Sequence, residues 1–569
     1  MSAPHASTHR LLAPISRRSF LSGLAVTAAT TLLAACGQQA APPAAPPATA
    51  VPAVPAAKVE SKPAEATKPA APTSAPVAPA AAAPASTTAP AAKTTSSRGE
   101  LRIAVGIHFP GSTDGNKDGF THVFWGMGET LTRLTREQKL EPWVAESFTK
   151  ADPNTWRFTL RKGVKFWDGS PLTAQAIADS IKLNFETQPA AGRFISKDTQ
   201  VTAEGDSVVV FKTSRPHGDL PNSLASQYFV ISKPGAEGAS VETGPFRLTK
   251  FVKDQEFALE AFADHWAGPP ALAKISLRNA ADANSRVLAL QSGDVDMLWG
   301  LPPEVVKTLG PDIEKQVLPS TRVHSVILNL TRPPFADRAV REAMSLGLDR
   351  AQLNTVGLDG LGAPATSLFP KGAGLEIADI QATDIEKAKR LLDEAGWKMG
   401  ADNVRAKDGQ RIAFTLYSYP GRAELTPIAV AMQGQLKLLG FEIKVQSVQD
   451  ITAQIKDGNF EATMYSVNSA VTGDPQYLFA ASVLKGGAAN FGGYENPQME
   501  AVIEELRGES DPAKRQAISL KAQEILRADV PNLYLLSAPI VAAYKKGKVQ
   551  NFAIHPNDIY FIDRAISVG

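Results

Sequence analysis

Residues 156–169 read WRFTLRKGVKFWDG. In the first part of this stretch, Trp156–Leu160, apolar and polar side chains alternate, which is typical of a strand with one buried face. The residues 161–163 and 166–169 then indicate the end of that strand and a tight turn at glycine, with the aromatic side chains packed inside. The stretch therefore predicts a folded domain that contains a β-sheet.

Farther along, the chain alternates helices with strands. Helix start signals lie at Asp384, Thr426, Asn496 and Asp511. Gly396 and Gly440 are the matching stop signals for the first two of these helices. Residues 441–445 alternate directly after Gly440 and predict the next strand. Strand–helix–strand units of this kind predict an α/β fold.

Length and charge limit the domain count and the class of partner. At 569 residues the chain is too long for one hydrophobic core, so at least two domains are expected. The chain has 59 basic and 57 acidic residues, a net charge of +2, which gives no reason to expect a nucleic acid as partner. Cys36 is the one cysteine, so neither a disulfide within the chain nor a zinc site built from cysteines can form.

The N-terminus reads as an export signal. Paired arginines at 17 and 18 stand directly before an apolar run, 20–35, that is too short to span a bilayer. The order resembles the twin-arginine export signature, and Leu32 to Cys36 resembles a bacterial lipobox. Cys36 would then be lipidated and become the first mature residue. The alternative is an N-terminal membrane anchor with an incidental cysteine.

We therefore predict an export signal with lipobox at 1–35 and a lipid-anchored tether at 36–98. The tether is rich in alanine and proline and has almost no large apolar side chains, so it cannot bury a core and is expected to stay extended. The protein would be held at the outer face of the cell membrane, in a periplasmic or cell-surface location.

Motifs for covalent chemistry are absent from the sequence. It contains no phosphate-binding Gly-x-x-x-x-Gly-Lys-Ser/Thr loop and no Gly-x-Ser-x-Gly nucleophile turn. The eight histidines are scattered without metal-ligand spacing. Residue types alone leave a hydrolase with paired carboxylates open, but no such pair stands out.

A series of segments resembles one family, the peptide-, nickel- and opine-binding components of bacterial ABC importers (extracellular solute-binding protein family 5). The matching segments are, in chain order, 140–147, 158–169, 243–246, 329–335, 340–343, 395–397, 473–475 and 490–494. The resemblance covers residues from about 100 to 569, and the signal, the lipobox and the tether agree with it independently.

The resemblance implies a two-lobed, periplasmic-binding-protein-like α/β clamshell (type II, large variant) with the ligand cleft between the lobes. Lobe I would comprise 99–322 and a return segment, 535–569, and lobe II would comprise 323–534. The implied role is capture of a small ligand, which closes the lobes for recognition by the permease subunits of the importer. No enzymatic activity and no cofactor are expected, and the receptor would be a monomer.

Ligand contacts are expected from segments that line the cleft in relatives. Residues 417–424 resemble the stretch of opine- and chelate-binding members that supplies an arginine for a ligand carboxylate, so Arg422 is the expected anion anchor. The alternative for Arg422 is a surface salt bridge, for example with Glu424. Further expected contacts, by stacking or hydrogen bonding, are Tyr417, Tyr465, Asn468, Tyr494 and Trp125. Trp125 has the alternative of a core position.

Departures from the family pattern reduce the number of ligand classes that are expected. Peptide binders of the family place an aspartate just before the Gly-Asp-Pro segment, whereas residues 469–472 of this chain contain no carboxylate. Some nickel binders have a histidine slightly earlier, where residues 465–467 have none. A carboxylate-bearing ligand remains: a short modified peptide, an opine or a preformed metal chelate. A sensing receptor of the same fold and a secreted hydrolase are the alternative functions.

Overall fold

The computed structural model of the protein describes residues 99–106, 108–377, 381–456 and 458–569, all of which belong to one unit, Pro90–Gly569. The predicted export signal, the lipidation of Cys36 and the tether at 36–98 lie outside the described residues. Within these residues, no helix has the length and apolar character that a membrane crossing requires.

The strand predicted at 156–160 is confirmed as part of β5 (Thr155–Leu160), which buries Trp156, Phe158 and Leu160 on one face. Its sheet has the order β4-β5-β7-β6, all antiparallel, with β4 at Ala145–Asp152, β7 at Val208–Lys212 and β6 at Gln200–Glu204. The following turns are confirmed as well. Gly163 (φ 79°) and Gly169 (φ 83°) adopt the left-handed conformation that favours glycine.

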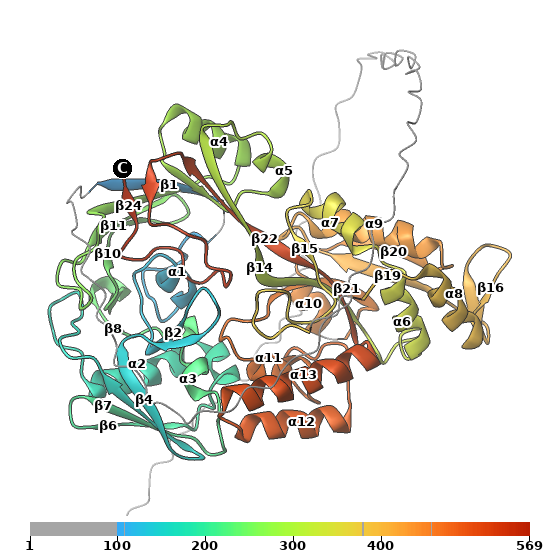
Figure 1. Ribbon diagram of the computed structural model, residues 1–569, viewed down its shortest axis with the longest axis horizontal. Helices are drawn as coiled ribbons and strands as arrows, with labels where there is room; N and C mark the ends of the chain where they lie inside the picture. Colours follow the sequence, from blue (N-terminus) through green and yellow to red (C-terminus); the bar gives the residue numbers. More distant parts are fainter. Residues whose placement is uncertain (1–98, 107, 378–380, 457) are drawn as a thin grey trace, which may run out of the picture. The chain divides into compact units, whose positions relative to one another are not determined.

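A second, mixed sheet of eleven strands passes through the whole unit (Figure 1). Its strands are, in spatial order, β10 (Phe246–Val252), β11 (Glu256–Ala261), β12 (Lys274–Asn279), β1 (Glu100–Val105), β13 (Met297–Trp299), β22 (Asn532–Lys545), β14 (Ile313–Leu328), β21 (Ala462–Asn468), β19 (Ala413–Ser418) and β20 (Glu442–Ser447), with β15 (Ala363–Pro364) beside β22. β1 runs parallel to both of its neighbours, and β19 runs parallel to both of its own.

The two longest strands, β14 and β22, connect the two sides of this sheet (Figure 1). They pair antiparallel from Ile313 opposite Lys545 to Ile327 opposite Asn532, with a register shift between Pro319 and Val323. We call the elements from β1 to α5, together with residues 546–569, the β1 side, and the elements from α6 to α13 the β21 side. The predicted lobe limits at 322/323 and 534/535 fall within β14 and β22.

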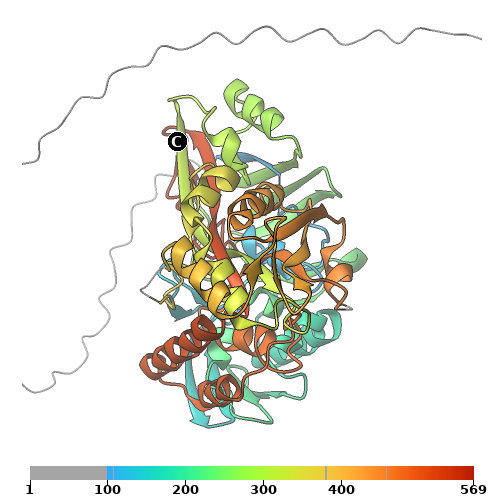
Figure 2. The ribbon, with the colours of Figure 1, turned by 90° about the vertical axis from the view of Figure 1, so that its right-hand side faces the viewer.

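Both the β1 side and the β21 side contain helices. On the β1 side they are α1 (Gly119–Phe124), α2 (Ala174–Thr187), α3 (Leu220–Ser223), α4 (Ala283–Ser292) and α5 (Pro303–Val306). On the β21 side they are α6 (Arg338–Leu346), α7 (Arg350–Leu358), α8 (Ile385–Glu394), α9 (Leu425–Lys437), α10 (Ile451–Lys456), α11 (Gln476–Ser482), α12 (Pro497–Gly508) and α13 (Pro512–Asp529). α12 and α13 lie side by side in both views (Figures 1 and 2).

Several of these helices begin where the sequence predicts. The side chains of Asp384, Asn496 and Asp511 accept hydrogen bonds from backbone amides in the first turns of α8, α12 and α13. The helix predicted from Thr426 begins one residue earlier, at Leu425, and its N-cap residue, Glu424, makes no side-chain cap. The α/β class is therefore confirmed.

Shorter elements complete the unit. They are β2 (Thr132–Leu134), β3 (Leu140–Pro142), β8 (Ser232–Pro234), β9 (Ser240–Glu242), β16 (Lys398–Met399), β17 (Arg405–Lys407), β18 (Gln410–Arg411), β23 (Val549–Gln550) and β24 (Ser567–Val568), with 3₁₀ turns at Pro189–Arg193, Gln227–Phe229 and Ala236–Gly238.

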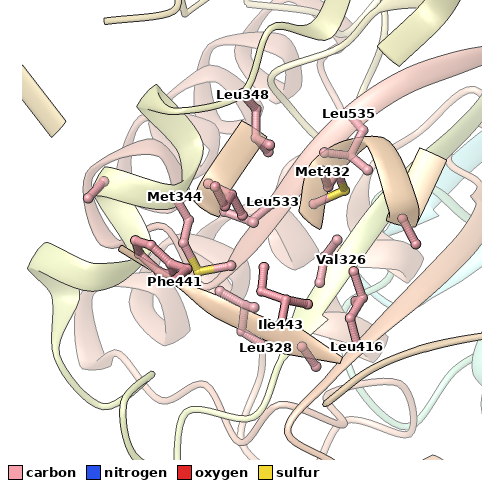
Figure 3. Packing of buried hydrophobic residues seen from close by; sticks show 14 of the residues in the cluster. Val326, Leu328, Met344, Leu348, Leu416, Met432, Phe441, Ile443, Leu533 and Leu535 are labelled. Atoms are coloured by element: carbon pink, nitrogen blue, oxygen red, sulfur yellow. The ribbon is translucent and has the colours of Figure 1, made fainter. Parts of the chain in front are cut away.

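Each side of the large sheet has a hydrophobic core of its own. On the β21 side, Leu416, Met432, Phe441 and other apolar side chains pack together with residues of β14 and β22 (Figure 3). On the β1 side, aromatic side chains such as Phe124 pack against the far end of β22. Burying each such side chain contributes about 1.5–3 kcal/mol. Two cores joined by two long strands are what a two-lobed protein requires.

Candidate ligand-binding cleft

A cavity of about 310 Å³ lies where the β1 side faces strands β14 and β21. Its lining comes from three parts of the chain. Phe194 and Tyr228 belong to the β1 side, Tyr465 and Tyr477 to the β21 side, and Asp558 to the segment after β22. A volume of this size suits a small-molecule ligand.

Stacked aromatic rings form one wall of the cavity. The rings of Phe194 and Tyr477 are stacked with their centroids 4.5 Å apart, and Tyr228 lies 5.2 Å from Phe194. The Tyr477 hydroxyl donates a hydrogen bond to the backbone oxygen of Asn468 at 3.2 Å. This stack joins the β1 side to α11 of the β21 side, so it forms only when the two sides face each other closely.

Asn468 lies on the cavity wall at the end of β21, and its side chain is fully used. Its Nδ2 donates to Oδ1 of Asn557 at 2.9 Å and to Oδ1 of Asp558 at 2.8 Å. Its Oδ1 accepts hydrogen bonds from Thr321 Oγ1 at 2.7 Å and from Ala470 N at 3.3 Å. Asn468 therefore holds the segment after β22 against β21.

Arg322 and Asp558 form an ion pair at the cavity. Nη2 of Arg322 lies 3.3 Å from Oδ2 of Asp558. Nε of Arg322 is buried and has no hydrogen-bond partner among the described residues. Burial disfavours the charged carboxylate, but the nearby guanidinium groups of Arg322 and Arg422 outweigh burial and lower the pKa of Asp558.

Arg422 lies on the loop between β19 and α9. Burial and the like charge of Arg322 lower the pKa of Arg422, which places the two guanidinium groups in the same electrostatic environment. Glu424 lies 3.2 Å from Nε2 of His324. Despite burial, the nearby His324 side chain and the charge of Arg422 lower the pKa of Glu424 to about 2. Within the described ranges, the guanidinium of Arg422 has no hydrogen bond or ion pair, so the salt bridge with Glu424 considered above does not form here.

The other expected contact residues divide into two groups. Tyr465 lines the cavity, whereas neither Tyr417 nor Arg422 is among its described lining residues. Tyr417 packs beside Tyr465 against Ile455 and Phe460. Trp125 is fully buried in the core of the β1 side, where its Nε1 donates to the backbone oxygen of His108 at 2.8 Å, as the alternative of a core position predicts.

Tyr494 is also buried in a core. Its hydroxyl donates to Oδ2 of Asp529 at 2.6 Å, and its ring packs in a cluster on the β21 side. Neither Tyr494 nor Trp125 is among the described residues that line the cavity. Both side chains are held by hydrogen bonds that serve the fold.

Sequence reasoning missed other lining residues. Arg193 ends a short 3₁₀ turn and Phe194 follows it. Arg322 lies in the middle of a strand, and Asp558 lies in a segment without regular structure. No periodicity or motif marks these positions, because their common property is that the fold brings them to one cavity.

A larger cavity of about 630 Å³ lies within the β1 side and the segment after β22. The carboxylate of Glu129 at this cavity accepts hydrogen bonds from His265 Nε2 at 3.1 Å, Trp266 Nε1 at 3.0 Å and Thr243 Oγ1 at 2.8 Å. Its central polar group is therefore satisfied within the protein. Among the described residues, no group of three or more His, Cys, Asp or Glu side chains is arranged to hold a metal ion.

Comparison with known proteins shows which family has this architecture. Residues 139–490 match the family described as "Bacterial extracellular solute-binding proteins, family 5 Middle". Nickel-binding protein NikA of Staphylococcus aureus is 29% identical over 451 residues, which cover 77% of this chain and 88% of NikA. Oligopeptide-binding protein AppA of Bacillus subtilis is 27% identical over 469 residues, which cover 76% of this chain and 85% of AppA.

A crystal structure of Staphylococcus aureus NikA in complex with Ni(L-His)2 is similar in fold, with a TM-score of 0.69 and 26% identity. The match covers 83% of this chain and 100% of that chain. The chain belongs to family 5 of the bacterial extracellular solute-binding proteins. The predicted two-lobed clamshell with a cleft between the lobes is thereby confirmed. Members of the family are binding components of ABC importers, and this general role applies to the chain.

Proposed function

We propose that the protein is a lipid-anchored, extracytoplasmic receptor that captures a small carboxylate-bearing ligand and delivers it to the permease subunits of an ABC importer. The observation that carries the proposal is the cavity of about 310 Å³, which is lined from both sides of the large sheet and by the segment after β22. A ligand in this position contacts both sides at once, so its binding favours the closed arrangement.

The lobes of the proposed receptor follow the predicted limits. Lobe I comprises 99–322 and 535–569, and lobe II comprises 323–534. The chain would cross between the lobes within β14 and β22, and the register shift between Pro319 and Val323 offers a place where β14 can bend. Closure by a hinge in these strands would bury the ligand without any covalent chemistry.

The anchor of the proposed receptor is the lipid on Cys36, the one cysteine of the chain. With Cys36→Ser, the protein is expected to leave the membrane fraction, because the acyl chains supply its membrane affinity. Fractionation of cells followed by immunoblotting measures this. If the variant stays in the membrane fraction, an uncleaved N-terminal anchor replaces the lipid anchor.

The ligand is proposed to present a carboxylate to Arg422. The Arg422 side chain is partly buried, and no ion pair within the described residues neutralises its guanidinium. A carboxylate can form two parallel hydrogen bonds with such a group, and these bonds strengthen where water is excluded. A short modified peptide, an opine and a metal chelate with carboxylate groups all satisfy this requirement. One relative, NikA of Staphylococcus aureus, was solved in complex with Ni(L-His)2, and histidine itself has a carboxylate.

The proposal is tested by calorimetry on the full chain purified in mild detergent, with dipeptides, opines and nickel with and without histidine as ligands. A receptor binds one class with one-to-one stoichiometry and leaves it chemically unchanged. Turnover of the ligand would support a hydrolase instead. Co-purification with permease subunits separates a transport receptor from a receptor that acts only in sensing.

A further inference from the structure

The charged groups that line the cavity of about 310 Å³ differ in whether all their hydrogen-bonding atoms have partners. Asp558 is the one acidic residue among the described residues that line it. Both of its carboxylate oxygens have partners: Oδ1 accepts from Asn468 at 2.8 Å, and Oδ2 accepts from Arg322 at 3.3 Å. The cavity therefore offers no unused carboxylate that would favour a ligand cation.

Arg322 has a hydrogen-bond donor that no acceptor in the described part of the chain uses. Its side chain is 17% exposed and lines the cavity, and its Nε is buried without a hydrogen-bond partner in the described part of the chain. A buried N–H group without an acceptor destabilises the structure, because it has lost its hydrogen bond to water. An oxygen atom of a bound ligand would remove that cost, so the geometry favours a ligand that brings an acceptor.

Arg193 supplies a second guanidinium from another element. It ends the 3₁₀ turn Pro189–Arg193 on the β1 side, is exposed, and lines the same cavity. Within the described ranges it makes no ion pair. A ligand anion that contacts both Arg193 and Arg322 would join this turn to strand β14.

The nearest other charges do not cancel these two guanidinium groups. Glu424 is held by His324 at 3.2 Å, and the Arg422 guanidinium adds to the positive potential near Arg322. Burial lowers the pKa of His108 to about 4, so its ring is neutral at pH 7. Guanidinium groups therefore outnumber free carboxylates around the cavity.

We propose that the cleft selects ligands of net negative charge and that Arg322 and Arg193 are specificity-determining residues, which bind the anionic groups of the ligand from two separate elements, β14 and the turn Pro189–Arg193. This inference rests on the proposed receptor function and deepens it. The shared chemistry is a compact ligand with at least two carboxylates. Such a ligand is either metal-free, like an acidic peptide, or a carboxylate chelate of a metal ion.

The test measures thermal stability and calorimetric affinity of the full chain at constant ionic strength. The probes are the near-isosteric dipeptides Ala-Glu and Ala-Gln, the cationic dipeptide Ala-Lys, and citrate with and without nickel. Ala-Glu or citrate is expected to raise the melting temperature more than Ala-Gln, and Ala-Lys least. If nickel with citrate raises the melting temperature more than citrate alone does, the ligand is a carboxylate chelate of a metal ion.

Arg322→Gln is expected to weaken binding of the preferred anionic probe at least tenfold, and Arg322→Lys less than Arg322→Gln. Arg390→Gln is the matched control, because Arg390 is exposed on α8 away from the cavity. The unliganded melting temperatures of all variants show whether each one folds. Arg193→Gln should weaken the same probe without any change in unliganded stability, because Arg193 is exposed.

Three results overturn charge selection. The first is preferred binding of Ala-Gln or Ala-Lys, which would leave the receptor function intact. The second is unchanged affinity for anionic probes in folded Arg322→Gln. The third is the absence of any anion-specific stabilisation in the wild type. Co-purification with permease subunits reports on the receptor function separately, so failure of one proposal does not imply failure of the other.

Discussion

The cavities of about 630 Å³ and about 310 Å³ contain similar residue types but differ in how their polar groups are used. In the cavity of about 630 Å³, Glu129 accepts three hydrogen bonds, and Arg133 pairs with Glu141 at 2.6 Å while it lies over the ring of Trp143. In the cavity of about 310 Å³, Nε of Arg322 lacks an acceptor.

The comparison shows that volume does not identify the binding site in this protein. A cavity whose polar groups satisfy one another is part of the fold, whereas buried donors without acceptors indicate a place for a ligand. The larger cavity is therefore expected to control stability, and the smaller one is expected to control affinity.

Glu129→Ala, in the larger cavity, should have the largest effect, and it tests whether that cavity controls stability rather than ligand affinity. Removal of the buried carboxylate leaves His265, Trp266 and Thr243 without their acceptor, so unfolding free energy should fall by about 3 kcal/mol or more. Urea denaturation measures the change, with Glu129→Gln as the conservative control. Normal stability combined with lost ligand binding would make the larger cavity the binding site.

The pH dependence of stability should also distinguish the β1 side from the start of α9. His122 Nδ1 lies 2.6 Å from Oε1 of Glu242, and both side chains are buried. Burial opposes the charged imidazole, but the charge and hydrogen bond of Glu242 outweigh it and raise the pKa of His122 to about 9. Because this pKa lies above the unfolded value of 6.5, the pair stabilises the fold fully below pH 6.5.

That contribution, about 3 kcal/mol, should be lost as the pH rises from 6.5 to about 9. Urea denaturation across this range measures the loss, and His122→Gln should flatten the dependence. At the start of α9 the lowered pKa of Glu424, about 2, has the opposite sign: its contribution is present above pH 4.5 and is lost as the pH falls toward 2. Equal pH dependence in His122→Gln and the wild type would contradict the assignment to this pair.

Arg422→Ala should affect affinity and spare stability. The guanidinium has no hydrogen bond or ion pair with any other described residue, so its loss costs the fold little. Ligand affinity should fall at least tenfold, which corresponds to about 1.4 kcal/mol. Calorimetry with the ligand found in the screen measures the change. Unchanged affinity would remove Arg422 from the site.

Phe194→Leu should have the smallest effect. The substitution removes the aromatic stack on Tyr477, which joins the two sides of the cleft, while it keeps an apolar side chain. Such a stack contributes about 0.5–1.5 kcal/mol, so ligand affinity should fall less than tenfold. Phe158→Leu, in the core of the β1 side, is the control that changes stability without touching the cleft. An effect on stability alone would make the Phe194 stack part of the fold rather than of the closure.

Prediction from sequence succeeded where the signal was local. The strand at 156–160 and the caps at Asp384, Asn496 and Asp511 depend on alternation and on a side chain next to a helix start, and the structure confirms each of them. The two-lobed class followed from ordered family segments, and the comparisons confirm it.

The contact residues show where such prediction stops. Tyr465 and Asn468 lie on the cavity wall, whereas Trp125 and Tyr494 are held in cores by hydrogen bonds to partners distant in sequence. An aromatic residue in a family segment looks the same in either setting. Only the packing around it separates a ligand contact from a core residue.

The amino-acid sequence by itself determined the family, the α/β class and the local elements, because each of these is written in short patterns along the chain. The tertiary structure alone decided which charged groups meet at the cleft. Arg193, Arg322 and Asp558 come from a turn, a strand and a terminal segment, and the pairing of β14 with β22 and β21 brings them together. Their net effect depends on distance and burial, which no single stretch of sequence contains.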